Sequence, residues 1–437
     1  PNIVKQSVPI LIAAFLVAVF LLIFLLERLG GFADNSDGVV RVYYADNISP
    51  AHQWVIDEFN RLHRGRIEVV PVNLPFEKFT TNERKELLAR SLRNKSDRLD
   101  IFAVDLIWVP RFSRWCEPLN GLVSQKEREQ ILPQAEESCV FDSTLMALPV
   151  YLDVGLLYYR KDLIRQLPGG SGVERDLRAS MTWGQFDSLG RTVAKSGRPF
   201  YLFQGNDFEG LTCSFFEMIA GQDREFFHRR PLDFESPIAR RALHMLVDFV
   251  WKDKISPPAV SEFDEIRSYT YALDHNAYCV RGWPNFIESF QAGNLARGVV
   301  DSLERAPLPH FPGREPVTVF GGWNLMISRY STRKAEALEF AKFFQREAVQ
   351  EKLFEIAGYI PTDLAVYSDS AYIAAHPILG FYRDLIASGF HRPSLVEYTK
   401  MSDIISRAVH RAIKGEVDPD TALHEASREI LRTGATE

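Results

Sequence analysis

The sequence predicts an α/β protein of two lobes, preceded by an N-terminal transmembrane helix. Three observations support this prediction. Residues 8–26 are apolar and free of charge, strands alternate with amphipathic helices from residue 39, and a second such series begins after residue 150. Such alternation is typical of α/β folds with a largely parallel sheet. A chain of 437 residues is also too long for one hydrophobic core.

The apolar segment at residues 8–26 predicts a membrane anchor. As a helix, its 19 residues would span roughly 28 Å, close to the hydrocarbon core of a bilayer. A signal-peptide core is usually shorter, at about 7–15 residues. Residues 31–33 offer a small-residue cleavage site, but Glu27 and Arg28 precede them, so we favour an uncleaved single-pass anchor in the cell membrane. The lobes would then face the periplasm or the extracellular side.

The first lobe is predicted from residues 39–150 together with 312–363. Its expected strands are 39–45, 67–72 and 99–106, and its expected helices are 51–65 and 82–96. Residues 151–311 together with 364–437 form the predicted second lobe. A long apolar and aromatic strand at 148–163, which Asp153 and Gly155 interrupt, leads into it. The lobe ends with two helices, and the last has Asp418 as its N-cap and Pro419 at its first helical position. The binding lobes are expected to be monomeric.

The cysteines leave two interpretations open. None of the 4 has a metal-binding spacing. Outside the cytoplasm they could pair as Cys116 with Cys139 and Cys213 with Cys279, one disulfide in each half of the chain. The alternative is that all of them are small core residues.

Several function classes are disfavoured. A net charge of −6 provides no basic footprint, so we expect no nucleic-acid partner. No nucleophile elbow, zinc-protease motif or phosphate-binding loop is found, and no metal or cofactor is expected. The strand-end acids Asp105, Asp153 and Glu209 could form a glycosidase pair, although such acids are more often caps or structural partners.

Aromatic and polar side chains recur where predicted strands break, and this favours a sugar site. Sugar hydroxyls bind charged and amide groups, and their C–H faces pack on aromatic rings. Each tryptophan taken singly is more often a core residue. The residues at these breaks are Asp105, Trp108, Tyr151, Asp153, Trp283, Gly322, Trp323 and Asn324.

Five segments together resemble the extracellular solute-binding proteins of carbohydrate ABC importers, in particular the trehalose/maltose-binding type. They are LPVYLDVGLLYYRKDL, AYCVRGWPN, VFGGWNLMIS, GYIPTD and the C-terminal stretch that begins RPSLVEYTKMSD. The resemblance implies a periplasmic-binding-protein fold with hinge crossovers that closes on a carbohydrate. It also implies permease subunits as partners and binding without catalysis. Its implied ligand contacts are Asp46, Asp105, Tyr151, Asp153, Glu209, Trp283, Gly322, Trp323 and Arg392.

The predicted function is therefore a membrane-anchored protein that delivers an α-linked disaccharide or oligosaccharide to an ABC permease. The anchor departs from the usual pattern of the family, in which a lipidated cysteine or no anchor is found. A sugar-sensing ectodomain of a membrane receptor is the main alternative, and a glycosidase is a weaker one.

Overall fold

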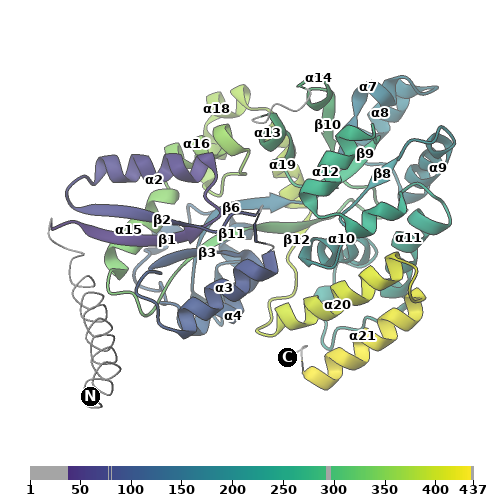
Figure 1. Ribbon diagram of the computed structural model, residues 1–437. Coiled ribbons are helices and arrows are strands. Elements are labelled where there is room, and N and C mark those ends of the chain that lie inside the picture. Colours follow the sequence, from purple (N-terminus) through teal and green to yellow (C-terminus); the bar gives the residue numbers. More distant parts are fainter. Residues whose placement is uncertain (1–37, 77, 80, 292–296, 435–437) are drawn as a thin grey trace, which may run out of the picture.

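The computed structural model describes residues 38–76, 78–79, 81–291 and 297–434, which form two lobes lying side by side (Figure 1). The predicted anchor at residues 8–26 lies outside this described part. Among the described helices, none is long and apolar enough to cross a bilayer.

The sheet of the first lobe is mixed rather than largely parallel. Its strand order is β12-β11-β3-β1-β2, and β6 also pairs with β11. The first three strands along the chain are parallel, as predicted, but β11 runs antiparallel to both β3 and β6. The strands are β1 (Val40–Asp46), β2 (Ile67–Asn73), β3 (Ile101–Asp105), β6 (Leu148–Val154), β11 (Thr318–Ile327) and β12 (Gly389–Phe390).

The second lobe is built on a smaller sheet with the order β10-β7-β9-β8. A short hairpin of β4 (Val140–Phe141) and β5 (Thr144–Leu145) precedes it in the chain. The sheet strands are β7 (Leu156–Arg160), β8 (Tyr201–Leu202), β9 (Cys279–Gly282) and β10 (Leu303–Ala306).

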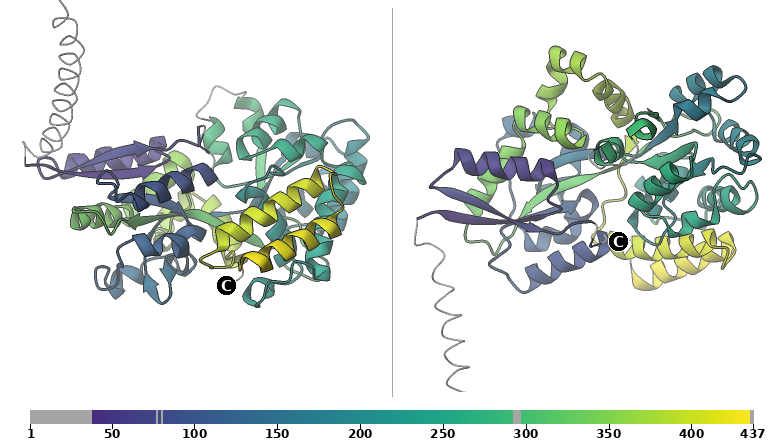
Figure 2. Two further views of the ribbon diagram at one scale, coloured as in Figure 1. Left: turned by 60° about the horizontal axis from the view of Figure 1, so that its bottom comes forward. Right: turned by 45° about the horizontal axis from the view of Figure 1, so that its top comes forward.

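Helices cover the sheets of both lobes. In the first lobe they include α2 (Pro50–Leu62), α3 (Thr81–Arg93), α4 (Val109–Phe112), α6 (Pro133–Glu137), α15 (Lys334–Phe344) and α16 (Glu347–Ala357). In the second lobe they include α8 (Gly170–Arg178), α9 (Trp183–Ala194), α10 (Glu209–Ala220), α11 (Pro237–Trp251), α12 (Glu265–Asp274), α20 (Tyr398–Ile413) and α21 (Pro419–Thr433). Figures 1 and 2 show α20 and α21 packed together along the second lobe, with α20 reaching toward α3 and α4.

Local sequence explains where the principal helices start. Ser49 caps α2 in a capping box with His52, and Pro50 occupies the first turn. Asp418 caps α21 by accepting hydrogen bonds from the backbone N–H groups of Asp420 and Thr421. The start of α21 is thus the predicted one.

In its described part the chain crosses between the lobes at three neighbouring places. Gly155 separates β6 from β7, the segment 307–317 joins β10 to β11, and the segment 388–397 carries β12 and leads into α20. The crossings touch one another: the Gly155 N–H donates to the carbonyl oxygen of Val319 at 3.2 Å, and Thr318 pairs with Gly389. Gly155 and the segments 307–317 and 388–397 together form the hinge.

The lobe boundaries differ in two places from those predicted. The first sheet continues through Val154, so the first crossing falls at Gly155 and not at residue 150. Helix α19 (Ile378–Ala387), assigned to the second lobe from sequence, contacts β6 and β11 of the first sheet.

The predicted disulfides are wrong, because all four cysteines are buried free thiols. Cys116 Sγ lies 4.0 Å from the sulfur of Met326, and Cys139 Sγ lies 4.0 Å from the hydroxyl of its neighbour Ser138. Burial raises the pKa of the thiols of Cys116, Cys139, Cys213 and Cys279. The alternative interpretation as small core residues is therefore confirmed.

Candidate functional site

The first lobe presents its polar residues at one edge of its sheet. Asp46 and Asp105 are the last residues of the parallel strands β1 and β3, and ligands of open α/β sheets bind outside such carboxyl ends. The antiparallel strand β11 places Trp323 opposite Asp105, and β6 places Tyr151 opposite Trp323. Asp153 pairs with Gly321, two residues before Trp323, so these side chains share one face of the sheet.

Gly322 allows β11 and β6 to meet closely at this point. Its φ is +128°, and a Cβ added there would lie 2.4 Å from the carbonyl oxygen of Tyr151. The register of the two strands also shifts between Trp323 and Asn324. A residue with a side chain could not occupy this bend without strain.

Trp323 is packed on one face by an arginine. The Arg84 guanidinium carbon, from α3, lies 4.2 Å from the centre of the indole ring and 4.3 Å from that of Phe76. Arg84 is fully buried, and its Nη2 donates to Asp46 at 3.0 Å. Among the described residues, Arg84 Nε and Nη1 have no hydrogen-bond partner. Both nitrogens are therefore buried donors that this part of the chain leaves unsatisfied.

Both carboxylate oxygens of Asp46 accept hydrogen bonds from other residues of the protein. Its carboxylate accepts a hydrogen bond from the Tyr44 hydroxyl at 2.5 Å and lies 3.3 Å from His52 Nε2, in addition to its ion pair with Arg84. It thus orients Arg84 rather than offering free oxygens.

Trp283 is contributed by the second lobe and reaches the same face of β11. A Cβ added at Gly321 would lie 3.0 Å from the indole Cζ3 of Trp283 and 3.3 Å from the Cβ of Asp153. The Trp283 indole N–H donates to Glu265 at 3.3 Å, and burial raises the pKa of Glu265. Trp283 and Trp323 therefore converge from different lobes.

Arg392 links carboxylates of both lobes. Its guanidinium donates to Asp105 at 2.8 Å and to Glu209, the first residue of α10, at 2.6 Å. Glu209 also accepts hydrogen bonds from the hydroxyls of Tyr398 and Ser402. Asp105 and Glu209 are thus both ion-paired to Arg392, and burial raises the pKa of Glu209.

Asp153 is a buried carboxylate without an ion-pair partner among the described residues. Its Oδ1 has no hydrogen-bond partner there either. Burial and the nearby Asp105 raise the pKa of Asp153 to about 7, although Arg281 opposes this shift. Such a group gains most from a ligand that donates hydrogen bonds.

Tyr151 lies beside Trp323 and belongs with Asp105, Asp153 and Trp283 to one cluster around it. Its ring stacks on that of Tyr359, with centroids 4.0 Å apart and planes 4° from parallel. Tyr359 belongs to the GYIPTD segment.

Two predicted ligand residues instead serve the interior. Trp108 is 2% exposed and packs between Phe112 and the edge of Trp323. Asn324 is 1% exposed, and its amide donates to the carbonyl and hydroxyl oxygens of Ser138. The alternation of strand side chains places Asn324 away from the face that carries Trp323. We therefore leave both residues out of the site.

A sequence profile of the bacterial extracellular solute-binding proteins matches residues 44–351. The chain belongs to this family. It is similar to a probable ABC transporter-binding protein of Deinococcus radiodurans, with 25% identity over 364 residues, 80% of this chain and 84% of that protein. It is also similar to the mannitol-binding protein of Pseudomonas aeruginosa, with 23% identity over 81% of this chain and 85% of that protein.

Solved structures of similar proteins share the two-lobed fold. The maltose-bound MalE3 of T. maritima has a TM-score of 0.79 and 25% identity, and the match covers 90% of this chain and all 100% of that one. The GacH receptor of Streptomyces glaucescens, solved without ligand and with acarbose, has a TM-score of 0.77 at 20% identity over 90% of this chain and 98% of that chain. The predicted family and its two-lobed α/β fold are thus confirmed.

Sequence reasoning missed several residues of this solute-binding protein that surround the two tryptophans. Arg84 lies on an amphipathic helix, where a charge normally faces solvent. Arg281 precedes Trp283 by two residues in an otherwise apolar strand, and this unusual context was a usable signal. The full set is Phe76, Arg84, Glu265, Arg281 and Tyr359.

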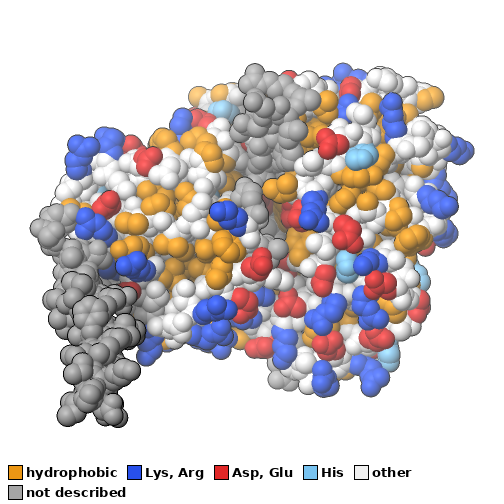
Figure 3. All heavy atoms as spheres, viewed as in Figure 1, with side chains coloured by type: hydrophobic (Ala, Val, Ile, Leu, Met, Phe, Trp, Pro, Cys, Tyr) orange, Lys and Arg blue, Asp and Glu red, His pale blue; other side chains and the backbone are white. Residues whose placement is uncertain are grey.

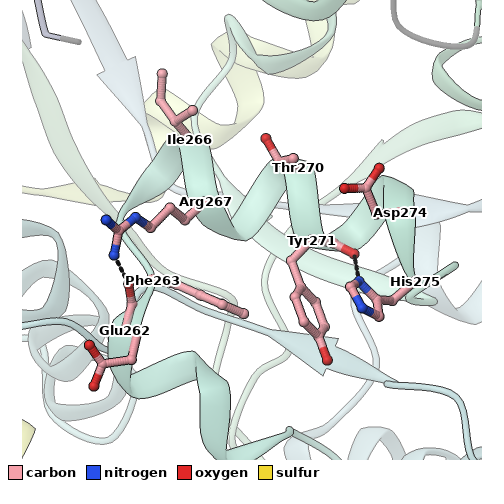
Figure 4. A pocket seen from close by; sticks show the side chains of 8 residues that line it. All are labelled: Glu262, Phe263, Ile266, Arg267, Thr270, Tyr271, Asp274 and His275. Atoms are coloured by element: carbon pink, nitrogen blue, oxygen red, sulfur yellow. Dashed lines mark hydrogen bonds between the residues drawn. The ribbon is translucent and has the colours of Figure 1, made fainter.

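One surface hollow of this solute-binding protein lies apart from the cluster. It measures about 380 Å³ and is lined by side chains of α12 and of the residues next to its two ends (Figure 4). The rings of Tyr271 and His275 stack on each other there at 3.7 Å, so one face of each ring is occupied. None of the predicted ligand residues lines it.

The surface over α20 and α21 intersperses acidic and basic side chains rather than gathering one sign (Figure 3).

Proposed function

We propose that this solute-binding protein binds a neutral saccharide between its lobes and delivers it to an ABC permease. The convergence of Trp283 and Trp323 from different lobes, beside Asp105, Asp153 and Arg392, carries this proposal. Indole faces suit the C–H faces of sugar rings, and the carboxylates and arginines suit their hydroxyls.

The balance of buried charge favours an uncharged ligand. Asp46 neutralises Arg84, Glu217 neutralises Arg281, and Asp105 and Glu209 share Arg392. Asp153 and Glu265 add further acidic groups, and burial raises the pKa of each. A sugar phosphate or sugar acid would bring a negative charge into an already acidic site.

The α-glucoside class is the most specific ligand that we propose. The T. maritima neighbour is bound to maltose, and the S. glaucescens neighbour was solved with acarbose. We also propose that residues 8–26 hold the lobes at the outer surface of the cell membrane. Fractionation of cells producing the full chain would test the anchor, since a cleaved protein would leave the membrane fraction.

Binding is tested by thermal shift and calorimetry against maltose, trehalose, maltotetraose and mannitol, with glucose 6-phosphate as the anionic control. We expect at least one neutral compound to stabilise the protein, by about 2.7 kcal/mol at a concentration of 100 times Kd. Stabilisation by the sugar phosphate alone would refute the proposal. Release of monosaccharide from maltose or trehalose would reveal an enzyme.

Variants locate the site. We expect Trp323→Ala and Asp153→Ala each to weaken binding by about tenfold or more. Trp251→Ala is the matched control, because Trp251 is 47% exposed on α11 and bonds to the carbonyl of Ile413 within the second lobe. Circular dichroism confirms that each variant is folded. Wild-type affinity in both site variants would show that the ligand binds elsewhere.

A further inference from the structure

A buried ion pair lies directly beneath the hinge. Arg281 of β9 donates from Nη2 and Nε to the two carboxylate oxygens of Glu217 of α10, at 2.9 and 3.2 Å. Arg281 is 0% exposed and Glu217 is 6% exposed. A forked pair of this kind fixes the orientation of both side chains as well as their separation.

Two of the hinge crossings contact this ion pair. A Cβ added at Gly155 would lie 1.9 Å from Glu217 Oε1 and 2.7 Å from Arg281 Nη2, so the first crossing touches both partners. The N–H of Val319, at the start of β11 where the second crossing ends, lies 3.4 Å from the same Glu217 oxygen. The two crossings are also joined to each other, because the Thr318 hydroxyl donates to the carbonyl oxygen of Gly155 at 2.6 Å.

The other side of the pair supports the ring that the second lobe contributes to the site. The Arg281 guanidinium carbon lies 4.0 Å from the centre of the Trp283 ring. The backbone N–H of Trp283 donates to the hydroxyl of Tyr269 at 2.9 Å. The backbone of Trp283 is thus fixed by this hydrogen bond, and its ring packs against the Arg281 guanidinium. Arg281 therefore touches both the pivot of the lobes and the proposed stacking surface.

Stability alone does not explain an ion pair at this place. Replacing a buried pair by well-packed apolar residues is often neutral or stabilising. This pair is also incompletely satisfied, because Arg281 Nη1 has no hydrogen-bond partner among the described residues. Its forked geometry, however, can hold the hinge strands and the indole in one fixed relation.

We propose that Glu217 and Arg281 are positioning residues that join the hinge to the ring of Trp283. The pair sets the angle between the lobes and the placement of the ring together, so that closing the lobes brings the ring into register with β11. The part concerning ligand affinity rests on the proposed sugar-binding function, whereas the part concerning the hinge does not.

The hinge part is tested without ligand. Spin labels are attached to Lys126→Cys in the first lobe and Lys195→Cys in the second, both exposed positions, while the native cysteines are buried. Electron–electron double resonance then measures the distribution of distances between the lobes. We expect Glu217→Gln, which keeps the shape but removes the charge, to broaden the distribution of the unliganded protein.

Glu174→Gln is the matched control. Glu174 is a buried glutamate of the same lobe, 7% exposed, and it is ion-paired to Arg165 and Arg178 away from the hinge. We expect this variant to keep the wild-type distance distribution. A wild-type distribution in Glu217→Gln, or equal broadening in both variants, would overturn the proposal. Should Glu217→Gln fail to fold, Arg281→Lys provides the same test, because lysine lacks the fork.

Affinity is measured on the same proteins with maltose as the probe. We expect Glu217→Gln to weaken binding about tenfold and Glu174→Gln to leave it unchanged. Broadening in Glu217→Gln with unaltered affinity would overturn the link to the ring. If the wild-type protein binds none of the tested saccharides, the proposed function fails, while the distance measurements still decide the role of the pair at the hinge.

Discussion

The carboxyl group of Asp153 has a shifted pKa that follows from its place in the sheet. It pairs with Gly321 across the strands β6 and β11, and burial together with Asp105 raises its pKa to about 7. Near neutral pH the neutral and ionised forms therefore coexist. A sugar hydroxyl that donates to the ionised form lowers this pKa, so binding releases a proton.

We expect affinity for a neutral saccharide to rise between about pH 5.5 and about pH 8. Below the pKa a proton must leave Asp153 before it can accept from the ligand, so affinity falls by up to about tenfold for each pH unit. Above the pKa the dependence levels off. Calorimetry across this range checks the expectation. Asp153→Asn should bind more weakly and lose the dependence near pH 7, and equal wild-type affinities at both extremes would contradict the assignment.

At the level of elements, β11 organises the first lobe and the hinge together. It pairs with β3, β6 and β12, and all of its residues are buried. Its early residues lie at the crossings, whereas Trp323 lies at the site. The bend at Gly322 allows one strand to serve both places.

We expect Gly322→Ala to destabilise the protein by about 1–3 kcal/mol, because the added Cβ meets backbone atoms of β6 and the φ of +128° disfavours any side chain. Gly184→Ala is the control. An added Cβ meets nothing within 4 Å at Gly184, which lies in the first turn of α9, so this change should be neutral or stabilising by about 0.4–1 kcal/mol. Urea unfolding measures both, and equal effects would show that the bend is not strained by a side chain.

At the scale of the whole molecule, the lobes also touch at a rim outside the site. Asp403 of α20 lies 3.6 Å from Lys85 Nζ and accepts a hydrogen bond from Asn82 at 3.3 Å, both from α3. Arg111 of α4 donates to the Thr399 hydroxyl at 2.6 Å. These contacts join the two lobes through residues other than the tryptophans.

We expect Asp403→Asn to weaken the binding of every ligand by the same factor, up to about fivefold. The pair is partly exposed and so contributes about 0.2–1 kcal/mol, and a smaller closed population scales all affinities equally. Asp420→Asn removes a similar exposed partner, paired with Arg240 inside the second lobe, and should change no affinity. A change in the ratio between two saccharides in Asp403→Asn would mean that Asp403 contacts the ligand.

The sequence predicted the local features of this fold well. Hydrophobic periodicity and caps depend on residues close in the chain, so the strands, the start of α21 and the interruption at Gly155 could be read directly. Three features could not be read in this way: the free state of the four cysteines, the burial of Trp108, and the hydrogen bonds of the Asn324 amide to Ser138. Each depends on which distant segment packs against the residue.

The sequence by itself determined the two α/β series, the family and the aromatic residues near the strand ends. Tertiary structure decided which of those side chains meet. The ion pairs that shape the site join residues far apart in the chain. The separation is 38 positions for Arg84–Asp46 and 64 for Arg281–Glu217. It is 183 positions for Arg392–Glu209 and 287 for Arg392–Asp105. A charge within an amphipathic helix or a strand carries no sign of its partner, because electrostatic pairing depends on distance in space and not on distance along the chain.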